Sequence, residues 1–249
     1  MTNASTATRD PRVWKFWGTL VWGLVVFAAM GIGQITLVAY YVWTKGGPVD
    51  GASLVALVGN GRTIALSVIA GLPPVLAALW LAIRFTRFSF ADYLALRGFA
   101  WKWLLIGMIG LAVLSQGWDW VAKAVGHEVS PGFMGEVLKS ARAENSLWLL
   151  VLGFCVAAPL TEELMTRGFL YRGWSESFLR PFGAIILSTL VWTCMHLQYD
   201  AFFLAQVFSI GLLFGYLRYR SNSTWLTIIL HGINNLAATL QTIYLLNAA

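Results

Sequence analysis

The sequence predicts an all-α fold, a polytopic bundle of transmembrane helices with about seven spans. Of its 249 residues, 58% are hydrophobic and only 11% are charged, and the mean hydropathy is +0.70. Soluble domains carry roughly 25% charged residues. Apolar runs long enough to cross a bilayer recur along the chain, and many of the 13 Trp flank them, as aromatic rings do at lipid–water boundaries.

Each expected span is a mostly apolar segment of about 20 residues. The segments are 16–43, 63–83, 103–122, 147–170, 182–197, 201–218 and 224–246. The first is long enough to tilt or break, and the fifth is short and ends at His196. Proline residues in the second and fourth segments predict kinks, and neighbouring helices or water can bond the carbonyls that a kink frees. These residues are Pro73, Pro74 and Pro159.

Residues 1–146 are expected to form an N-terminal tail and three spans. Residues 147–249 are expected to form a core that carries the functional residues, and the two parts together make one compact membrane domain.

Basic residues gather in alternate loops, which predicts a cytoplasmic N-terminus in an inner or plasma membrane. The N-terminal tail contributes Arg9, Arg12 and Lys15. The net charge of +6 does not indicate nucleic-acid binding, because the basic residues are scattered among short loops instead of gathered on one soluble face.

Polar clusters interrupt three of the later spans. A charge near the bilayer centre costs at least ~2.5 kcal/mol, so such residues indicate function by default. The clusters are Glu162, Glu163 and Arg167; Trp192 and His196; and His231 and Asn235. In the second cluster, Trp192 is expected to pack beneath His196 and fix the angle of its ring.

The spacing within the clusters predicts which side chains meet. Glu163 and Arg167 are four residues apart, with the acid first, so they should pair on one helix face. Glu162 points about 100° away and has no basic partner on its own helix, which leaves it free to face a cavity as a general base. On the last span, His231 and Asn235 project together and could hold an oxyanion, a water or a metal.

Each residue also has a purely structural interpretation. His196 could bond a neighbouring carbonyl, Glu163 and Arg167 could clamp helices, and Asn235 could join two helices. An unpaired Glu, two His and an Asn on three helices are hard to explain as four independent coincidences, so an active site is the first hypothesis.

These motifs resemble those of the CPBP intramembrane proteases, a family of CAAX-processing and bacteriocin-processing enzymes also called Abi. The similarity rests on the Glu-Glu-x-x-x-Arg run at 162–167, the aromatic-x-x-x-His run at 192–196 and the His-x-x-x-Asn run at 231–235. It covers residues ~147–246. The family commonly has Phe where this chain has Trp192.

The resemblance implies hydrolysis of a peptide bond in a membrane-associated peptide or protein terminus. Glu162 with His196 would activate a water, His231 with Asn235 would stabilise the oxyanion, and two further residues, Glu163 and Arg167, would support them. Glu162, His196 and His231 could instead hold Zn²⁺ with an open position, so whether a metal takes part stays open. The expected partners are that substrate and the lipid bilayer.

Two other functions compete with the protease. A catalytically silent member of the same fold could serve as a membrane binding partner or assembly factor. A proton-coupled transporter could also use intramembrane Glu and His, but the sequence lacks the internal repeat and paired broken helices typical of transporters.

Overall fold

The computed structural model describes residues 11–46, 50–127 and 132–248, so Arg9 of the basic tail lies outside the described residues. Helices make up 84% of the described residues, and no strand occurs among them, which confirms the all-α prediction. The helices are α1 (Phe16–Lys45), α2 (Gly51–Gly59), α3 (Gly61–Arg84), α4 (Phe90–Tyr93), α5 (Trp101–Val125), α6 (Gly132–Ala143), α7 (Leu147–Leu152), α8 (Ala158–Glu163), α9 (Tyr171–Ser175), α10 (Arg180–Cys194), α11 (Ala201–Ser221) and α12 (Thr224–Ala248), with π-helical turns η1 (Gly153–Ala157) and η2 (Leu164–Leu170).

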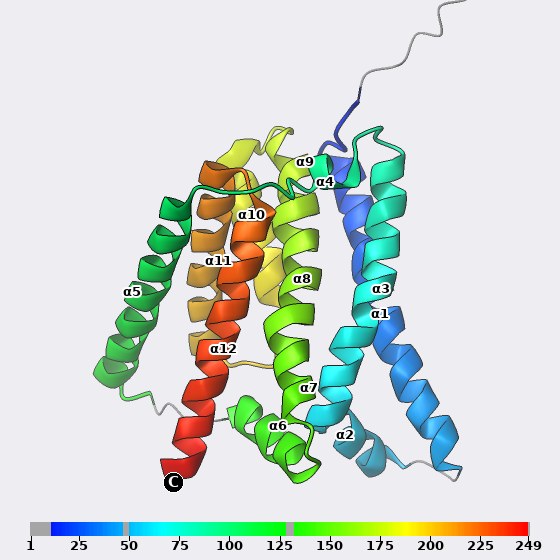
Figure 1. The fold of residues 1–249 in the computed structure, drawn as a ribbon, viewed down its shortest axis with the longest axis vertical. Coiled ribbons are helices and arrows are strands. Elements are labelled where there is room, and N and C mark those ends of the chain that lie inside the picture. The colour runs from blue at the N-terminus through cyan, green and yellow to red at the C-terminus, as the bar shows by residue number, and fades with distance from the viewer. Residues whose placement is uncertain (1–10, 47–49, 128–131, 249) are drawn as a thin grey trace, which may run out of the picture.

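The long helices run side by side, and the short helices α2 and α6 lie at one end of the bundle (Figure 1). Among the described residues, five helical segments are long and apolar enough to cross a membrane: 16–44, 61–84, 101–125, 147–175 and 201–221. Helix α10 is apolar but shorter, and α12 carries polar residues along its 25 residues. The expected count of about seven spans is therefore not confirmed.

The first apolar run, predicted to tilt or break, forms one helix, α1, of 30 residues, about 45 Å long at 1.5 Å per residue. The end of the fifth segment differs from the sequence prediction. The fifth segment, expected over 182–197, ends as a helix at Cys194. His196 consequently lies in the turn that follows α10.

The fourth apolar segment is a continuous rod from Leu147 to Ser175 whose winding changes twice, at η1 and at η2. At the end of η1, the Ala158 N–H donates to the Gly153 carbonyl, five residues back. The next donor in that pattern would be residue 159, a proline without an N–H, so the Phe154 carbonyl has no such partner. Asn235 Nδ2 on α12 donates to it at 2.8 Å, which satisfies a carbonyl that lipid could not.

Helices α1 and α3 approach closely beside the Pro73-Pro74 pair. Pro74 cannot donate to the Ala70 carbonyl four residues before it. Gly33 of α1 lies against that carbonyl, and a Cβ on Gly33 would also stand 2.7 Å from the Cα of Gly71. Small residues permit such backbone contact between membrane helices.

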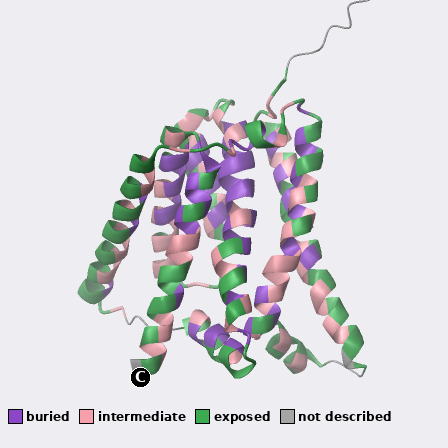
Figure 2. Ribbon diagram, in the orientation of Figure 1, coloured by how far each residue is buried: buried purple, intermediate pink, exposed green. Residues whose placement is uncertain are grey.

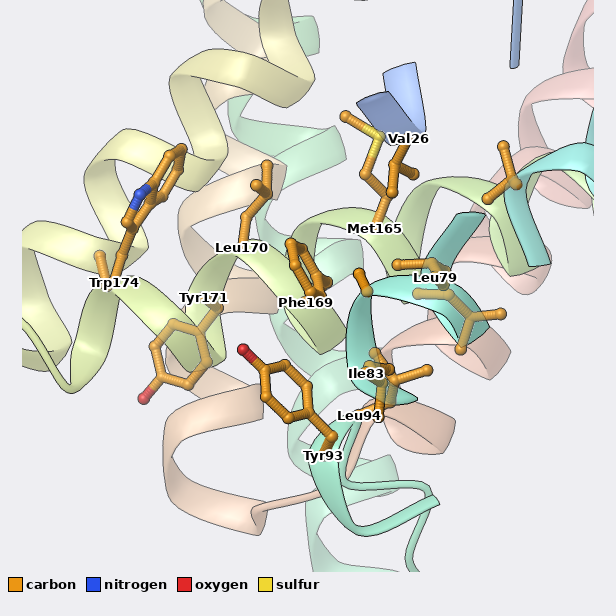
Figure 3. Packing of buried hydrophobic residues seen from close by; sticks show 14 of the residues in the cluster. Val26, Leu79, Ile83, Tyr93, Leu94, Met165, Phe169, Leu170, Tyr171 and Trp174 are labelled. Carbon is orange, nitrogen blue, oxygen red and sulfur yellow. The ribbon is translucent and has the colours of Figure 1, made fainter. Parts of the chain in front are cut away.

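Buried side chains concentrate in the central helices toward the end of the bundle where α4 and α9 lie (Figure 2). Figure 3 shows Tyr93 next to Phe169, and the two rings stack with centroids 5.5 Å apart. The loop that carries α4 is therefore part of the core, with Tyr93 and Leu94 fully buried. Because lipid tails are as apolar as these side chains, close packing and not water exclusion holds such helices together.

The α1–α3 contact predicts that Gly33→Ala lowers the thermal stability of the purified protein in detergent. The added methyl group has no room, and overpacking costs about 1–3 kcal/mol. Gly31→Ala, on the same helix, is the matched control, because a Cβ there meets nothing within 4 Å. Equal melting temperatures for the two variants would contradict the close approach.

Candidate active site

Glu162 stands near the end of α8, with its side chain 16% exposed. Its carboxylate has no basic partner on its own helix, but it is not free. The indole Nε1–H of Trp192, on α10, donates to Glu162 Oε2 at 2.6 Å. The sequence predicted only a packing role for Trp192 beneath His196 and did not indicate this hydrogen bond.

Two imidazoles face the same carboxylate oxygen. His196 Nε2 lies 4.0 Å from Glu162 Oε2, and His231 Nε2 lies 3.9 Å from it. These separations exceed direct hydrogen bonds and match a contact made through a water. One acid and two imidazoles from three segments of the chain therefore converge, as the polar clusters predicted.

The other ring nitrogen of each histidine is bonded. His196 Nδ1 lies 2.9 Å from the backbone carbonyl of Trp192, and His231 Nδ1 lies 3.1 Å from Glu163 Oε1. A carbonyl and a carboxylate only accept, so we assign the proton to Nδ1 in both rings. Both Nε2 atoms then point toward Glu162.

Glu163 and Arg167 form the expected ion pair. Arg167 donates from Nη1 to Glu163 Oε1 at 2.9 Å, and both side chains are 0% exposed. Arg167 also donates to the Gly211 carbonyl of α11 at 3.1 Å, and its guanidinium lies 4.6 Å from the centre of the Trp192 ring. Glu163 thus holds both Arg167 and His231, which joins the rod to α12.

Asn235, which is predicted to hold an oxyanion, a water or a metal together with His231, also makes a structural contact. One of its two amide N–H groups is used on the Phe154 carbonyl. A Cβ on Gly232, one turn earlier, would stand 2.6 Å from the Cys155 carbonyl oxygen. Helix α12 therefore packs on the irregular backbone that η1 and Pro159 create, and this contact sets where His231 projects.

Gly211 is a second residue whose importance the sequence did not indicate. A Cβ there would stand 2.9 Å from Trp192 Cε3 and 3.2 Å from Arg167 Nη2. Only a glycine leaves room for both side chains, and nothing in the sequence distinguishes it from the chain's other glycines.

The three residues that could ligate zinc do not fit a metal ion as they stand. In a tetrahedral zinc site each ligand atom lies ~2.0–2.2 Å from the ion, so any two ligand atoms are less than about 3.9 Å apart. Here the histidine nitrogens lie 3.9 and 4.0 Å from Glu162 Oε2. Within the described residues, no group of three or more His, Cys, Asp or Glu side chains could hold a metal ion. Zinc binding stays a prediction.

The fold and this centre define a membrane-embedded helical protein with a buried acid–imidazole cluster. A protein-family model, Rce1-like, described as type II CAAX prenyl endopeptidase Rce1-like, matches residues 144–237. The chain therefore carries an Rce1-like domain of the CAAX protease family, which confirms the resemblance to CPBP proteases, and this domain contains all the candidate site residues. Searches of the curated proteins and of the solved structures found no match.

The buried ion pair predicts that Arg167→Ala strongly destabilises the protein. Removing one partner leaves Glu163 charged and buried, which costs about 3–5 kcal/mol. Arg97→Ala is the matched control: Arg97 pairs with Asp92 at 3.2 Å, but these side chains are 53% and 58% exposed, and such a pair contributes at most ~1 kcal/mol. Unfolding in mixed detergent micelles measures both, and an Arg167→Ala variant as stable as Arg97→Ala would refute the clamp.

Proposed function

We propose that the protein is an intramembrane endopeptidase that hydrolyses a peptide bond near the terminus of a membrane-associated peptide or protein. The observation that carries the proposal is the convergence of the His196 and His231 Nε2 atoms on the Glu162 carboxylate. The family match supports a CAAX-type substrate, in which cleavage releases the three residues after a prenylated cysteine.

In the proposed mechanism, a water sits between Glu162 and His196. The bare Nε2 of His196 accepts one water hydrogen, while Glu162 accepts the other and removes it as the oxygen attacks the peptide carbonyl carbon. The carbonyl π bond opens, and its electron pair moves to the oxygen as a tetrahedral oxyanion. Glu162 then gives the proton to the amide nitrogen. The electron pair of the oxyanion re-forms the carbonyl as the C–N bond breaks, and the amine leaves a carboxyl group behind.

His231 and Asn235 are the proposed oxyanion donors. To donate from Nε2, His231 must carry a proton on both ring nitrogens. Glu163, a buried carboxylate 3.1 Å from Nδ1, stabilises that imidazolium. The cluster then contains two carboxylates and two cations, so its net charge is zero, which suits a site with little water. Asn235 would contribute the second N–H of its amide.

The mechanism predicts that Glu162→Gln abolishes turnover while the protein still inserts and folds. An amide cannot take the proton from water, and loss of a general base lowers kcat by about 10²–10⁴-fold. The measurement is cleavage of an internally quenched peptide with a prenylated CAAX terminus by the purified protein in detergent. The control is Glu136→Gln, since Glu136 is an exposed acid paired with Lys139.

An unimpaired Glu162→Gln variant would end the assignment of Glu162. A native protein that leaves prenylated and unprenylated peptides intact, but forms a stable complex with another membrane protein that survives Glu162→Gln, would favour the silent-partner function.

A further inference from the structure

We propose that Trp192 is the positioning residue of this site and fixes the two groups that activate the water. Its indole N–H holds the Glu162 carboxylate at 2.6 Å, and its backbone carbonyl holds His196 Nδ1 at 2.9 Å. The inference rests on the proposed function and adds a specific role for the aromatic residue of the second motif.

The indole is held firmly enough to orient a neighbour. Trp192 is 3% exposed. Its ring meets His196 and His231 edge to face, with centroids 5.0 and 5.3 Å away. On another side, the ring packs close to Gly211, since a Cβ there would stand 2.9 Å from Trp192 Cε3.

The same ring connects Glu162 to the buried ion pair. The Arg167 guanidinium lies 4.6 Å from the ring centre, within the range of a cation–π contact. The cation draws electron density from the ring and makes the N–H a better donor to the carboxylate at its edge. Trp192 thus joins the Glu163–Arg167 pair to Glu162, although Glu162 and Glu163 project about 100° apart on their helix.

The hydrogen bond distinguishes the two oxygens of Glu162. Oε2 accepts the charge-assisted bond from the indole, and it is also the oxygen that the Nε2 atoms of His196 and His231 face at 4.0 and 3.9 Å. A phenylalanine, which the family commonly has at this position, would keep the ring and the backbone carbonyl but supply no N–H. This chain therefore fixes its general base with a donor that a phenylalanine cannot provide.

The first test compares Trp192→Phe with Trp118→Phe. Trp118 is the matched control, because its indole N–H also crosses between helices, to Ser209 at 2.9 Å, but away from the site. We expect Trp192→Phe to lower kcat about 10- to 100-fold, the range typical of lost orienting contacts, with little change in KM. Trp118→Phe should leave kcat unchanged. A Trp192→Phe variant with native kcat, or with only KM altered, would overturn the positioning role.

The second test needs no activity. In protein labelled with ¹⁵N at the indole nitrogens, the N–H signal absent from Trp192→Phe is that of Trp192. We expect this signal to move in Glu162→Gln, because an amide accepts a weaker bond than a carboxylate, while the Trp118 signal stays in place. A Trp192 signal that does not move would overturn the proposal. A signal that moves in a protein without peptidase activity would keep the contact and reject the proposed function instead.

Discussion

The site depends on one constraint: the buried charge of Glu163 must be neutralised where lipid and protein exclude water. A carboxylate with 0% exposure is tolerated only with close partners of opposite charge or with hydrogen-bond donors. Arg167 on the same rod and His231 on α12 meet that need. Arg167 in turn bonds the Gly211 carbonyl on α11 and packs on Trp192 of α10. One acid therefore organises four segments of the bundle, and the groups proposed to act on substrate are placed as a result.

Adjacent acids can serve different helices because neighbouring residues on a helix point about 100° apart. Glu163 faces Arg167 and α12, whereas Glu162 faces Trp192 and α10. The changes in winding along the rod also help to place the site. Turns with π geometry are frequent at functional sites, and here η1 and Pro159 together free the Phe154 carbonyl, which accepts a hydrogen bond from Asn235. The contact of Asn235 with the Phe154 carbonyl fixes α12, and it thereby also places His231, which lies one turn before Asn235.

Much of this arrangement could be predicted from sequence, for identifiable reasons. Hydropathy located the long helices, and the four-residue spacing predicted the Glu163–Arg167 pair. Polar residues in apolar segments indicated where the centre lies. What could not be predicted depends on helix phase and on contacts between distant segments. The π turns shift the phase of the rod, so the bond of Asn235 to Phe154 is not visible in any spacing. The Trp192–Glu162 bond requires knowing how α10 and α8 face each other.

The central claim is that His196 and His231 both carry a proton on Nδ1 and direct Nε2 toward Glu162. The chain has 3 His, so ¹⁵N spectra of histidine-labelled protein in detergent at neutral pH test this directly, with His127→Asn removing the third ring. The structure predicts a protonated Nδ1 in both remaining rings. Two rings with bare Nδ1 and protonated Nε2 would contradict the account, because neither the Trp192 carbonyl nor Glu163 could then be the acceptor described.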